Sequence, residues 1–365
     1  MIVCLNLARS LSSQGVEVDL LCFLPSKEIL ERHRSELEQV YRRIFFVERD
    51  LERQYIGTLL LALASNKSYF LLKFQDPKMS TLLQRILLVE TYERTILEGA
   101  FLAAYRTVLE EYPQAAGRVT LRLHNVESEI FERLARKERR LLYRWLLRRE
   151  AFCFREHELE EVSRGDVRAI THRDASLLEE LTGREFSVMG PTIDLNANCP
   201  GSSGELEALS LVCVGNMKWL PNIRGIQWFL DEVWPAVRQE FPGVRFYAIG
   251  KNPPEELRRR EADGVVVTGY VDDVRPYFRR AHVFVVPILE GSGIRIKIIM
   301  ALAMGKEIIS TSVGAEGITF DGLNIADTPE EWIEGLRGLL ALPPRNRWDA
   351  VEYARAHHSW QLSFD

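Results

Sequence analysis

The predicted fold depends most on one stretch, Val285-Val-Pro-Ile-Leu-Glu-Gly-Ser-Gly-Ile-Arg-Ile-Lys-Ile-Ile-Met-Ala-Leu-Ala-Met-Gly-Lys-Glu-Ile-Ile309. An apolar run over 282–289 leads into a glycine loop at 290–293, and an uninterrupted helical pattern follows from Ile294 to Met304. Gly305 then ends the helix, and a second apolar strand pattern begins. This order of strand, glycine loop, helix and strand is the repeating unit of a parallel sheet.

The glycine loop and the two cations after it predict an anion site. Glycines let a ligand approach the backbone, and the first N–H groups of a helix point toward that ligand. Cations in the first turn oppose the helix dipole at a cost of roughly 0.3–1 kcal/mol each, so a bound diphosphate would explain Arg295 and Lys297. Alternatively, both side chains are solvated. If the helix has begun at Arg295, the two lie about 200° apart around it and cannot share one phosphate. The spacing by itself leaves both interpretations open.

Composition limits the class of protein. The chain has 365 residues, enough for two domains, with 46% hydrophobic and 27% charged residues, which excludes wholesale disorder. A net charge of −5 gives no support to nucleic-acid binding. Five scattered cysteines predict buried thiols in a reducing compartment, and no Cys-x-x-Cys or Cys/His metal-ligand spacing is present. No signal peptide is visible, and the longest uncharged apolar stretch, 55–64, is too short to span a bilayer, so a cytoplasmic protein is expected.

The N-terminal half alternates helices and strands but opens unusually. A helix over 4–11 and a strand over 16–21 are predicted, with only three residues ahead of the helix. A doubly wound domain normally begins with a strand and a loop at that point, so the first strand of this domain is expected to be missing. Further elements are expected as helices at 27–43, 51–90 and 127–163 and as strands at 44–47, 95–97, 119–123 and 167–171.

A polar linker at 196–205 separates this half from a second α/β unit. We expect a Rossmann-like domain over 1–195, another over 206–345, and a C-terminal helix over 346–365, with a ligand cleft between the two domains. The second unit is expected to contain strands at 209–214, 244–249, 265–268 and 282–287 and helices at 223–240 and 274–280.

Four stretches of the second unit share one family pattern. They read Val-Gly-Asn-Met-Lys-Trp-Leu-Pro-Asn (214–222), Thr-Gly-Tyr-Val-Asp-Asp-Val-Arg-Pro-Tyr (268–277), Gly-Ser-Gly-Ile-Arg-Ile-Lys (291–297) and Ser-Thr-Ser-Val-Gly-Ala-Glu-Gly-Ile (310–318). In this order and spacing they resemble the donor-binding domain of the family 4 glycosyltransferases, which have the GT-B fold. The segments 122–129 and 171–175 agree more loosely, so the resemblance extends over about residues 4–345.

The resemblance implies a hexosyltransferase-type enzyme. Such enzymes move a sugar from a nucleotide diphosphate sugar to a hydroxyl of a glycan or lipid-linked acceptor, with retention and without a metal ion. It implies that Arg295 and Lys297 face the diphosphate and that His124 meets the sugar or phosphate as a catalytic residue. Alternatively, His124 is a structural residue at a strand end whose hydrogen bonds are satisfied within the protein. The implied donor-binding residues are Gly215, Asn216, Gly269, Tyr270, Val271, Glu290, Gly291, Ser292, Gly293, Met300 and Glu316.

The sequence departs from that family at two glutamates with seven residues between them. When the Gly-Ser-Gly-x-Arg-x-Lys form is aligned, Ser292 and Met300 occupy the two positions, and Met300 would face the ribose with a thioether, which is a weak acceptor. The alternative is that Met300 belongs to the apolar core. Glu307 also stands where relatives often have proline. A GT-B relative that binds nucleotide without turnover is therefore a second interpretation. A Rossmann oxidoreductase is disfavoured, because no Gly-x-Gly-x-x-Gly opens a βαβ unit.

The segment 133–155 carries nine basic residues, with Leu141, Trp145 and Phe152 near one face. It could contact an anionic membrane at which a lipid-linked acceptor is found. A solvated helix, with its charge balanced by neighbouring glutamates, is the plainer interpretation.

Overall fold

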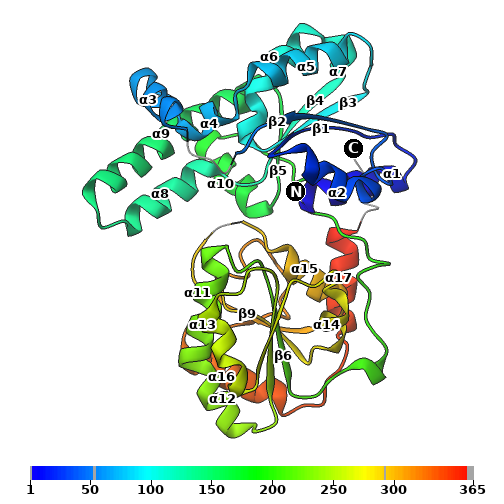
Figure 1. Ribbon diagram of the computed structural model, residues 1–365, viewed down its shortest axis with the longest axis vertical. Helices are drawn as coiled ribbons and strands as arrows, with labels where there is room; N and C mark the ends of the chain where they lie inside the picture. The colour runs from blue at the N-terminus through cyan, green and yellow to red at the C-terminus, as the bar shows by residue number, and fades with distance from the viewer. Residues whose placement is uncertain (1, 52–54, 292, 360–365) are drawn as a thin grey trace. The chain divides into compact units, whose positions relative to one another are not determined.

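The computed structural model describes residues 2–51, 55–291 and 293–359, which divide into two compact units, Met1–Gly190 and Pro191–Asp365 (Figure 1). Both units are α/β, and all their paired strands are parallel. None of the described helices is long and apolar enough to cross a membrane.

Two short parallel sheets form the centre of the first unit. β1 (Asp19–Leu24) pairs with β2 (Arg43–Glu48), and β3 (Arg94–Glu98), β4 (Arg118–Leu123) and β5 (Asp166–Ala169) pair in that order. The helices are α1 (Ile2–Ser13), α2 (Lys27–Leu37), α3 (Ile56–Ser65), α4 (Tyr69–Phe74), α5 (Pro77–Leu87), α6 (Arg106–Glu111), α7 (Pro113–Ala116), α8 (Glu127–Lys137), α9 (Leu141–Arg164) and α10 (His172–Thr182), with a 3-10 turn at Ala100–Tyr105. The predicted α/β alternation is confirmed. That a strand is missing ahead of the first helix stays a prediction.

The single long helix predicted over 127–163 is wrong. The chain leaves the helix at Glu138, whose backbone is extended, and forms the hairpin of α8 and α9 instead. The Glu138 carboxylate accepts hydrogen bonds from the backbone N–H of Arg140, at 2.9 Å, and from its guanidinium. The hairpin buries apolar side chains that one straight helix would leave exposed, since Phe131 of α8 stacks on Phe154 of α9 at 5.2 Å between ring centroids.

Glu158 of α9 caps the first turn of α8. Its buried carboxylate accepts hydrogen bonds from the backbone N–H of Glu127 at 2.7 Å and from the Ser128 hydroxyl at 2.5 Å. Burial raises the pKa of Glu158 to about 7, against the lowering effect of these hydrogen bonds. The N-terminal N–H groups of α8, which have no partner within their own helix, are satisfied by a residue from the neighbouring helix.

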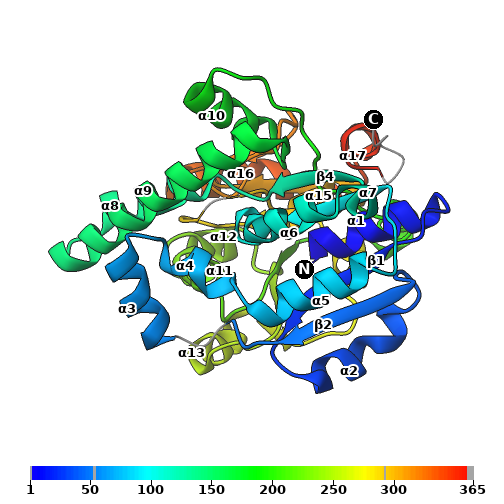
Figure 2. The same ribbon diagram turned by 90° about the horizontal axis from the view of Figure 1, so that it is seen from above.

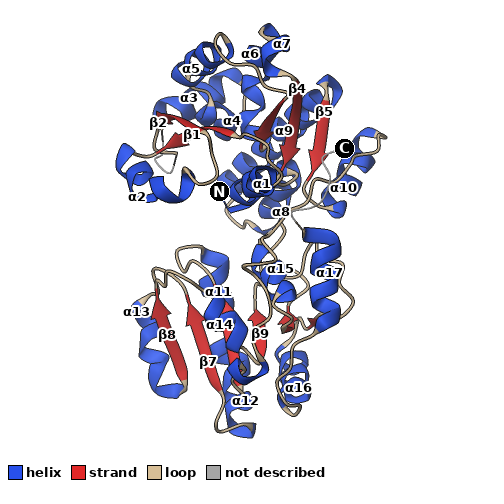
Figure 3. Ribbon diagram, turned by 90° about the vertical axis from the view of Figure 1, so that its right-hand side faces the viewer, coloured by secondary structure: helices blue, strands red, loops and turns tan. Residues whose placement is uncertain are grey.

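A six-stranded parallel sheet in the order β11-β10-β9-β6-β7-β8 forms the centre of the second unit, with helices on both faces (Figure 3). Its strands are β6 (Ser210–Val214), β7 (Arg245–Ile249), β8 (Val265–Gly269), β9 (Val283–Val286), β10 (Glu307–Ser310) and β11 (Asn324–Ile325). Its helices are α11 (Leu220–Trp228), α12 (Trp234–Glu240), α13 (Glu255–Arg258), α14 (Arg275–Arg280), α15 (Ile296–Ala303), α16 (Pro329–Leu340) and α17 (Trp348–His358). Short 3-10 turns lie at Ser203–Glu205 and Arg259–Asp263.

The helix predicted over 223–240 is interrupted. A π-helical turn, Phe229–Val233, joins α11 to α12, and Pro235 lies at the start of α12. Proline has no N–H to donate to the preceding turn, so the ladder of hydrogen bonds changes its spacing there. The side chains of the turn still reach the core, because Phe229 and Val233 are buried in the cluster around Trp234 and Trp332.

The predicted linker, 196–205, lies inside the second unit and is tied to it. The side chain of Asn346 donates a hydrogen bond to the Gly201 carbonyl at 2.9 Å, and Arg279 donates to the Ala197 carbonyl at 3.2 Å. The division between the two units falls earlier, after Gly190. The domain limits expected from the sequence stay a prediction.

We expect Gly225→Ala to destabilise the second unit strongly. A Cβ at this buried position in α11 would lie 1.8 Å from the Pro287 carbonyl oxygen, so the helix and the start of the loop after β9 would have to move apart. The control is Gly338→Ala in α16, where nothing lies within 4 Å and alanine should stabilise the helix by about 1 kcal/mol. Thermal unfolding of both variants measures the contrast, and equal effects at the two positions would contradict the packing described.

We expect Glu158→Gln to change how stability depends on pH. An acid whose folded-state pKa is raised binds its proton more tightly when folded, so its contribution to stability falls as the pH rises from 4.5 to about 7. The unfolding free energy of the variant should therefore rise relative to the native protein by on the order of 3 kcal/mol across that range. Glu156→Gln, at an exposed position of the same helix, is the control. Urea unfolding at several pH values measures the difference, and parallel pH profiles for the native protein and Glu158→Gln would refute the prediction.

Candidate functional site

The sheet of the second unit changes direction between β6 and β9. From β6 the chain continues to β7 and β8 on one side, and from β9 to β10 and β11 on the other. Loops that leave the carboxyl ends of two such strands diverge, and ligands of open α/β sheets bind in the crevice that results. Here these loops begin at Gly215, after β6, and at Pro287, after β9. They are the loops in which the sequence predicted a donor site.

Lys297 connects the two loops. Its ammonium donates hydrogen bonds to the Val214 carbonyl at 2.8 Å, at the end of β6, and to the Asn222 side-chain oxygen at 3.0 Å. The amide of Asn222 in turn donates to the Asn216 carbonyl at 3.0 Å. An ammonium has three N–H donors. In Lys297, two of them are used by the hydrogen bonds to Val214 and Asn222.

Arg295 is buried and lies against the glycine loop. Its guanidinium is 5.2 Å from the centre of the Trp219 ring, and a Cβ on Gly291 would lie 3.1 Å from its Nη2 atom. Helix α15 begins at Ile296, two residues later than predicted, and Arg295 precedes it with an extended backbone. Because only Lys297 has helical geometry, the separation of about 200° that a helical Arg295 would impose does not apply.

Two positive charges are therefore held together in a partly desolvated place. Burial lowers the pKa of the Arg295 guanidinium, while Glu316 acts in the opposite direction. Burial likewise lowers the pKa of Lys297, and the charge of Arg295 lowers it further. The protonated forms of both groups would be favoured by an anion bound beside them.

Glycines occupy the ends of three neighbouring strands of the second unit. The backbone N–H of Gly215 donates to the Ile249 carbonyl at 2.9 Å, and that of Gly250 to the Gly269 carbonyl at 3.1 Å. A Cβ on Gly250 would lie 1.8 Å from the Gly215 carbonyl oxygen, so the backbones of β6 and β7 approach each other closely here. In the loop after β9, Gly291 and Gly293 have φ values of 115° and 87°, which favour glycine.

The other predicted donor-binding residues lie in different surroundings. The backbone N–H of Gly293 donates to the Glu316 carboxylate at 3.2 Å, which brings Glu316 to the loop. Glu290 forms an ion pair with Arg224 of α11 at 2.6 Å. Tyr270 is 69% exposed after β8, whereas Val271 packs against the core. Ser292 lies outside the described residues.

Met300 is half-buried and packs against the apolar cluster under α15, while its neighbours Ile299 and Ala301 are fully buried. The helix is therefore not buried on all sides at this position. Whether its partly exposed side faces a ribose stays a prediction.

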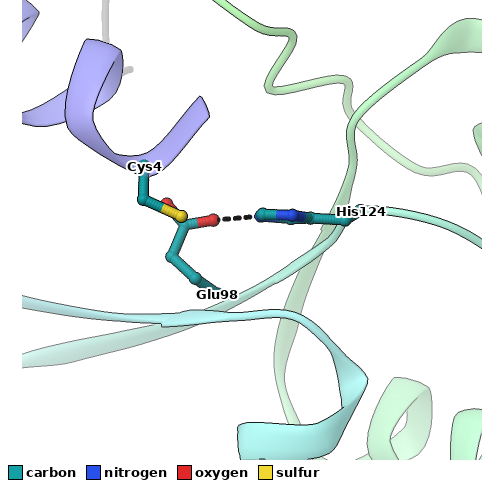
Figure 4. A group of neighbouring side chains, drawn as sticks. All are labelled: Cys4, Glu98 and His124. Atoms are coloured by element: carbon teal, nitrogen blue, oxygen red, sulfur yellow. Dashed lines mark hydrogen bonds and ion pairs between the residues drawn. The ribbon is translucent and has the colours of Figure 1, made fainter. Parts of the chain in front are cut away.

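His124 in the first unit belongs to a cluster with Glu98 and Cys4 (Figure 4). It follows β4 directly, and its Nε2 atom lies 2.5 Å from the carboxylate of Glu98, the last residue of β3. Cys4 projects from α1 toward the same point. Burial acts to lower the pKa of His124, but hydrogen bonds to Cys4 and Glu98 outweigh it and raise the pKa to about 9. The imidazole is therefore held as a cation at neutral pH.

The cluster contains three types of group that can bind zinc. The sulfur, nitrogen and oxygen donor atoms of Cys4, His124 and Glu98 lie within 4.8 Å of one another. However, the Glu98 carboxylate already accepts a hydrogen bond from the guanidinium of fully buried Arg122 at 3.1 Å. A metal ion would have to be bound next to that cation, which Coulomb repulsion disfavours.

Sequence reasoning missed four residues that hold the predicted ones in place. Asn222 and Trp219 lie in the first quoted family stretch, so their positions were visible but their contacts with Lys297 and Arg295 were not. Glu98 is the last residue of β3, and Arg122 is the last but one of β4. Their places near the carboxyl ends of two strands were the available signal, because the ends of parallel neighbours meet at one edge of the sheet. Arg122 also donates to the carbonyls of Met189 and Gly190, at 2.9 and 2.8 Å.

Comparison with known sequences finds a family match within the second unit. Residues 208–341 match the family model described as Glycosyl transferases group 1. A 44.6 kDa protein from the cps region of Klebsiella pneumoniae is 23% identical over 317 residues, which cover 84% of this chain and 77% of that protein.

Solved structures resemble the fold of nearly the whole chain. Sucrose-phosphate synthase from Thermosynechococcus elongatus superposes with a TM-score of 0.62 at 14% identity, covering 94% of this chain and 96% of the other. HepE from Anabaena in complex with UDP gives a TM-score of 0.61 at 11% identity and the same coverages. These similar structures are GT-B glycosyltransferases. Residues 208–341 therefore match the group 1 glycosyltransferases, and the chain has the GT-B fold.

Proposed function

We propose that this protein transfers a hexosyl group from a nucleotide diphosphate sugar to a hydroxyl of a glycan or lipid-linked acceptor, with retention and without a metal ion. The observation that carries the proposal is the pair of cations, Arg295 and Lys297, at the switch point of the second sheet. Two desolvated positive charges beside a glycine loop suit a diphosphate better than a neutral ligand. The family match of residues 208–341 and the nucleotide-bound structures of similar fold support the same ligand class.

In the proposed reaction the bond between the anomeric carbon and the diphosphate oxygen breaks, and its electron pair leaves with the diphosphate. The acceptor oxygen forms the new bond on the same face, and its proton passes to the departing phosphate. Arg295, the remaining N–H of Lys297 and the first N–H groups of α15 would stabilise the charge that develops on the leaving oxygens. For His124, which lies in the first unit and is held as a cation by Glu98, contact with the sugar or a phosphate stays what the family resemblance implies.

The acceptor follows only by analogy. A trehalose-phosphate synthase of similar fold from Burkholderia xenovorans was solved with glucose-6-phosphate, and HepE was solved with UDP and glucose, so sugar hydroxyls are the acceptor groups that we favour. The relative from the cps region of Klebsiella pneumoniae fits a role in polysaccharide biosynthesis.

A nucleotide-binding protein with lost or weak catalysis is the second candidate. Met300 favours it, because a thioether stands where a carboxylate would bind the ribose hydroxyls. The two candidates differ in whether nucleotide is released from a nucleotide sugar over time, since a binding protein would take up the donor and return it intact.

We expect isothermal titration with UDP, GDP and ADP to show one strong binder. Arg295→Gln should weaken that binding by about 10- to 100-fold, because a hydrogen bond to a charged group contributes about 1.5–3 kcal/mol. Arg238→Gln is the matched control, since Arg238 is a surface residue of α12 in the same unit with Asp263 as its partner. The absence of heat with all three nucleotides would defeat the proposal, and so would a normal affinity in Arg295→Gln.

We expect the imidazole of His124 to titrate near pH 9 in the native protein. Glu98→Gln should bring that pKa down toward or below the ordinary value of 6.5, because burial then acts with less opposition. The stability that the charged pair contributes is present below pH 6.5 and is lost as the pH rises through about 9.

Nuclear magnetic resonance of histidine-labelled protein measures this pKa, with His124→Gln to assign the signal. His33→Gln, at an exposed position of α2, controls for loss of any one histidine. A native pKa at or below 6.5 would show that the Glu98 pair does not hold the cation.

A further inference from the structure

Helix α3 exposes nearly all of its apolar side chains. Its ten residues, Ile-Gly-Thr-Leu-Leu-Leu-Ala-Leu-Ala-Ser, contain no charged group. Ile56 and Leu60 are 76% and 62% exposed, and only Ala62 is buried. Scattered exposed leucines are ordinary, but a helix that is apolar all round normally lies in a core or in lipid. The further exposed side chains are Leu59, Leu61 and Leu63.

The start of α9 exposes a second group of large apolar side chains. Leu141 and Leu142 are 72% and 65% exposed, and Tyr143 and Trp145 are also exposed. The two groups adjoin, because Leu63 of α3 and Trp145 of α9 line the same surface hollow. α3 also lies beside the α8–α9 hairpin in two perpendicular views (Figure 1 and Figure 2).

Polar contacts fix α3 to α9. The guanidinium of Arg149 donates hydrogen bonds to the Ala62 and Lys67 carbonyls, at 2.5 and 2.9 Å, and so satisfies the C-terminal end of α3. Glu150 accepts a hydrogen bond from the Ser68 hydroxyl at 2.6 Å, just after that end. The exposed apolar side chains are therefore presented by an anchored helix, so their exposure does not come from a loose end.

Basic side chains flank the apolar group at the start of α9, and one of them reaches α3. Among the described residues, Lys137, Arg139, Arg144 and Arg148 form no ion pair, and Arg140 lies over the Tyr143 ring at 3.9 Å. Arg148 also lines the hollow between Leu63 and Trp145. Leucine and tryptophan flanked by lysine and arginine are the composition that binds to the interface of an anionic bilayer.

We propose that α3 and the first turns of α9 form one membrane-docking surface. α3, about 15 Å long from its ten residues, would lie in the plane of the interface with its leucines among the acyl chains. Trp145 would lie at the level of the headgroups, and the surrounding cations would contact lipid phosphates. The surface belongs to the first unit only and does not depend on the proposed function.

The charge and the apolar side chains of this surface argue against two other binding partners. A second copy of the same surface would bring two clusters of arginine and lysine against each other, and like charges opposite one another disfavour that pairing. Nucleic acid would match the cations but would leave the five large apolar side chains of α3 without a partner. An anionic bilayer satisfies both parts of the surface together.

Sedimentation of the full chain with lipid vesicles tests the proposal. The protein should sediment with vesicles that contain phosphatidylglycerol and phosphatidylcholine, and should remain in solution with phosphatidylcholine alone. Arg139→Ser with Arg148→Ser should lower the partition coefficient about 30-fold, from about 1 kcal/mol per basic residue. Arg32→Ser with Arg355→Ser removes two exposed arginines elsewhere and should leave it unchanged.

The apolar part is tested in the same assay. Leu60→Ser with Trp145→Ser should lower the partition coefficient by about tenfold or more, whereas Leu342→Ser with Trp348→Ser, of similar exposure in the second unit, should not. Unchanged thermal unfolding shows that the variants are folded. Three results would overturn the proposal: no sedimentation of the native protein with anionic vesicles, equal loss in both apolar pairs, or a dimer in solution that only Leu60→Ser with Trp145→Ser dissociates.

Discussion

The parallel pairing of β6 with β9 is the constraint on which the candidate site depends. These strands are adjacent in the sheet but are separated in the chain by β7, β8 and their helices, so their following loops turn to opposite sides. The two loops hold the glycines and, with the start of α15, the cations of the site. The hydrogen bond of Lys297 to the Val214 carbonyl connects the helix after β9 to the end of β6. Removal of that pairing would separate the loop after β6 from the loop and helix after β9.

Unfavourable electrostatic interactions are concentrated at the start of α15. Arg295 and Lys297 are partly desolvated and repel each other, and Glu316 offsets the charge of Arg295 only in part. Natural proteins keep such unfavourable arrangements where a ligand relieves them. The first unit shows the opposite arrangement at His124, where Glu98 and Arg122 form a connected network of charges around the histidine. An added anion would stabilise the charges of Arg295 and Lys297, whereas the charge of His124 is already stabilised by Glu98.

The first unit also combines a rigid framework with an unusual surface. Aromatic packing and the Glu158 cap fix the α8–α9 hairpin, and Arg149 and Glu150 fix α3 against it. The large apolar side chains of α3 and of the start of α9 nevertheless remain exposed, although both helices are held in place. Anchored apolar helices next to cations are expected where a protein meets lipid, and the inference of a docking surface follows from that combination.

Much of the local structure, the GT-B fold and the family match of residues 208–341 could be predicted from the sequence by itself. Period-two and period-3.6 patterns with glycine or proline boundaries locate most strands and helices, because side chains on buried faces must be apolar. The order of the glycine loop, Arg295 and Lys297 likewise predicts a donor site in the second unit, and that site stays a prediction. Tertiary structure alone decided three things. The chain bends at Glu138, because Phe131 and Phe154 are buried only in a hairpin. Asn222 and Glu98 become partners of Lys297 and His124, because strand pairing brings distant segments to one edge. The leucines of α3 remain exposed, since an apolar pattern predicts that a face will be covered but does not identify what covers it.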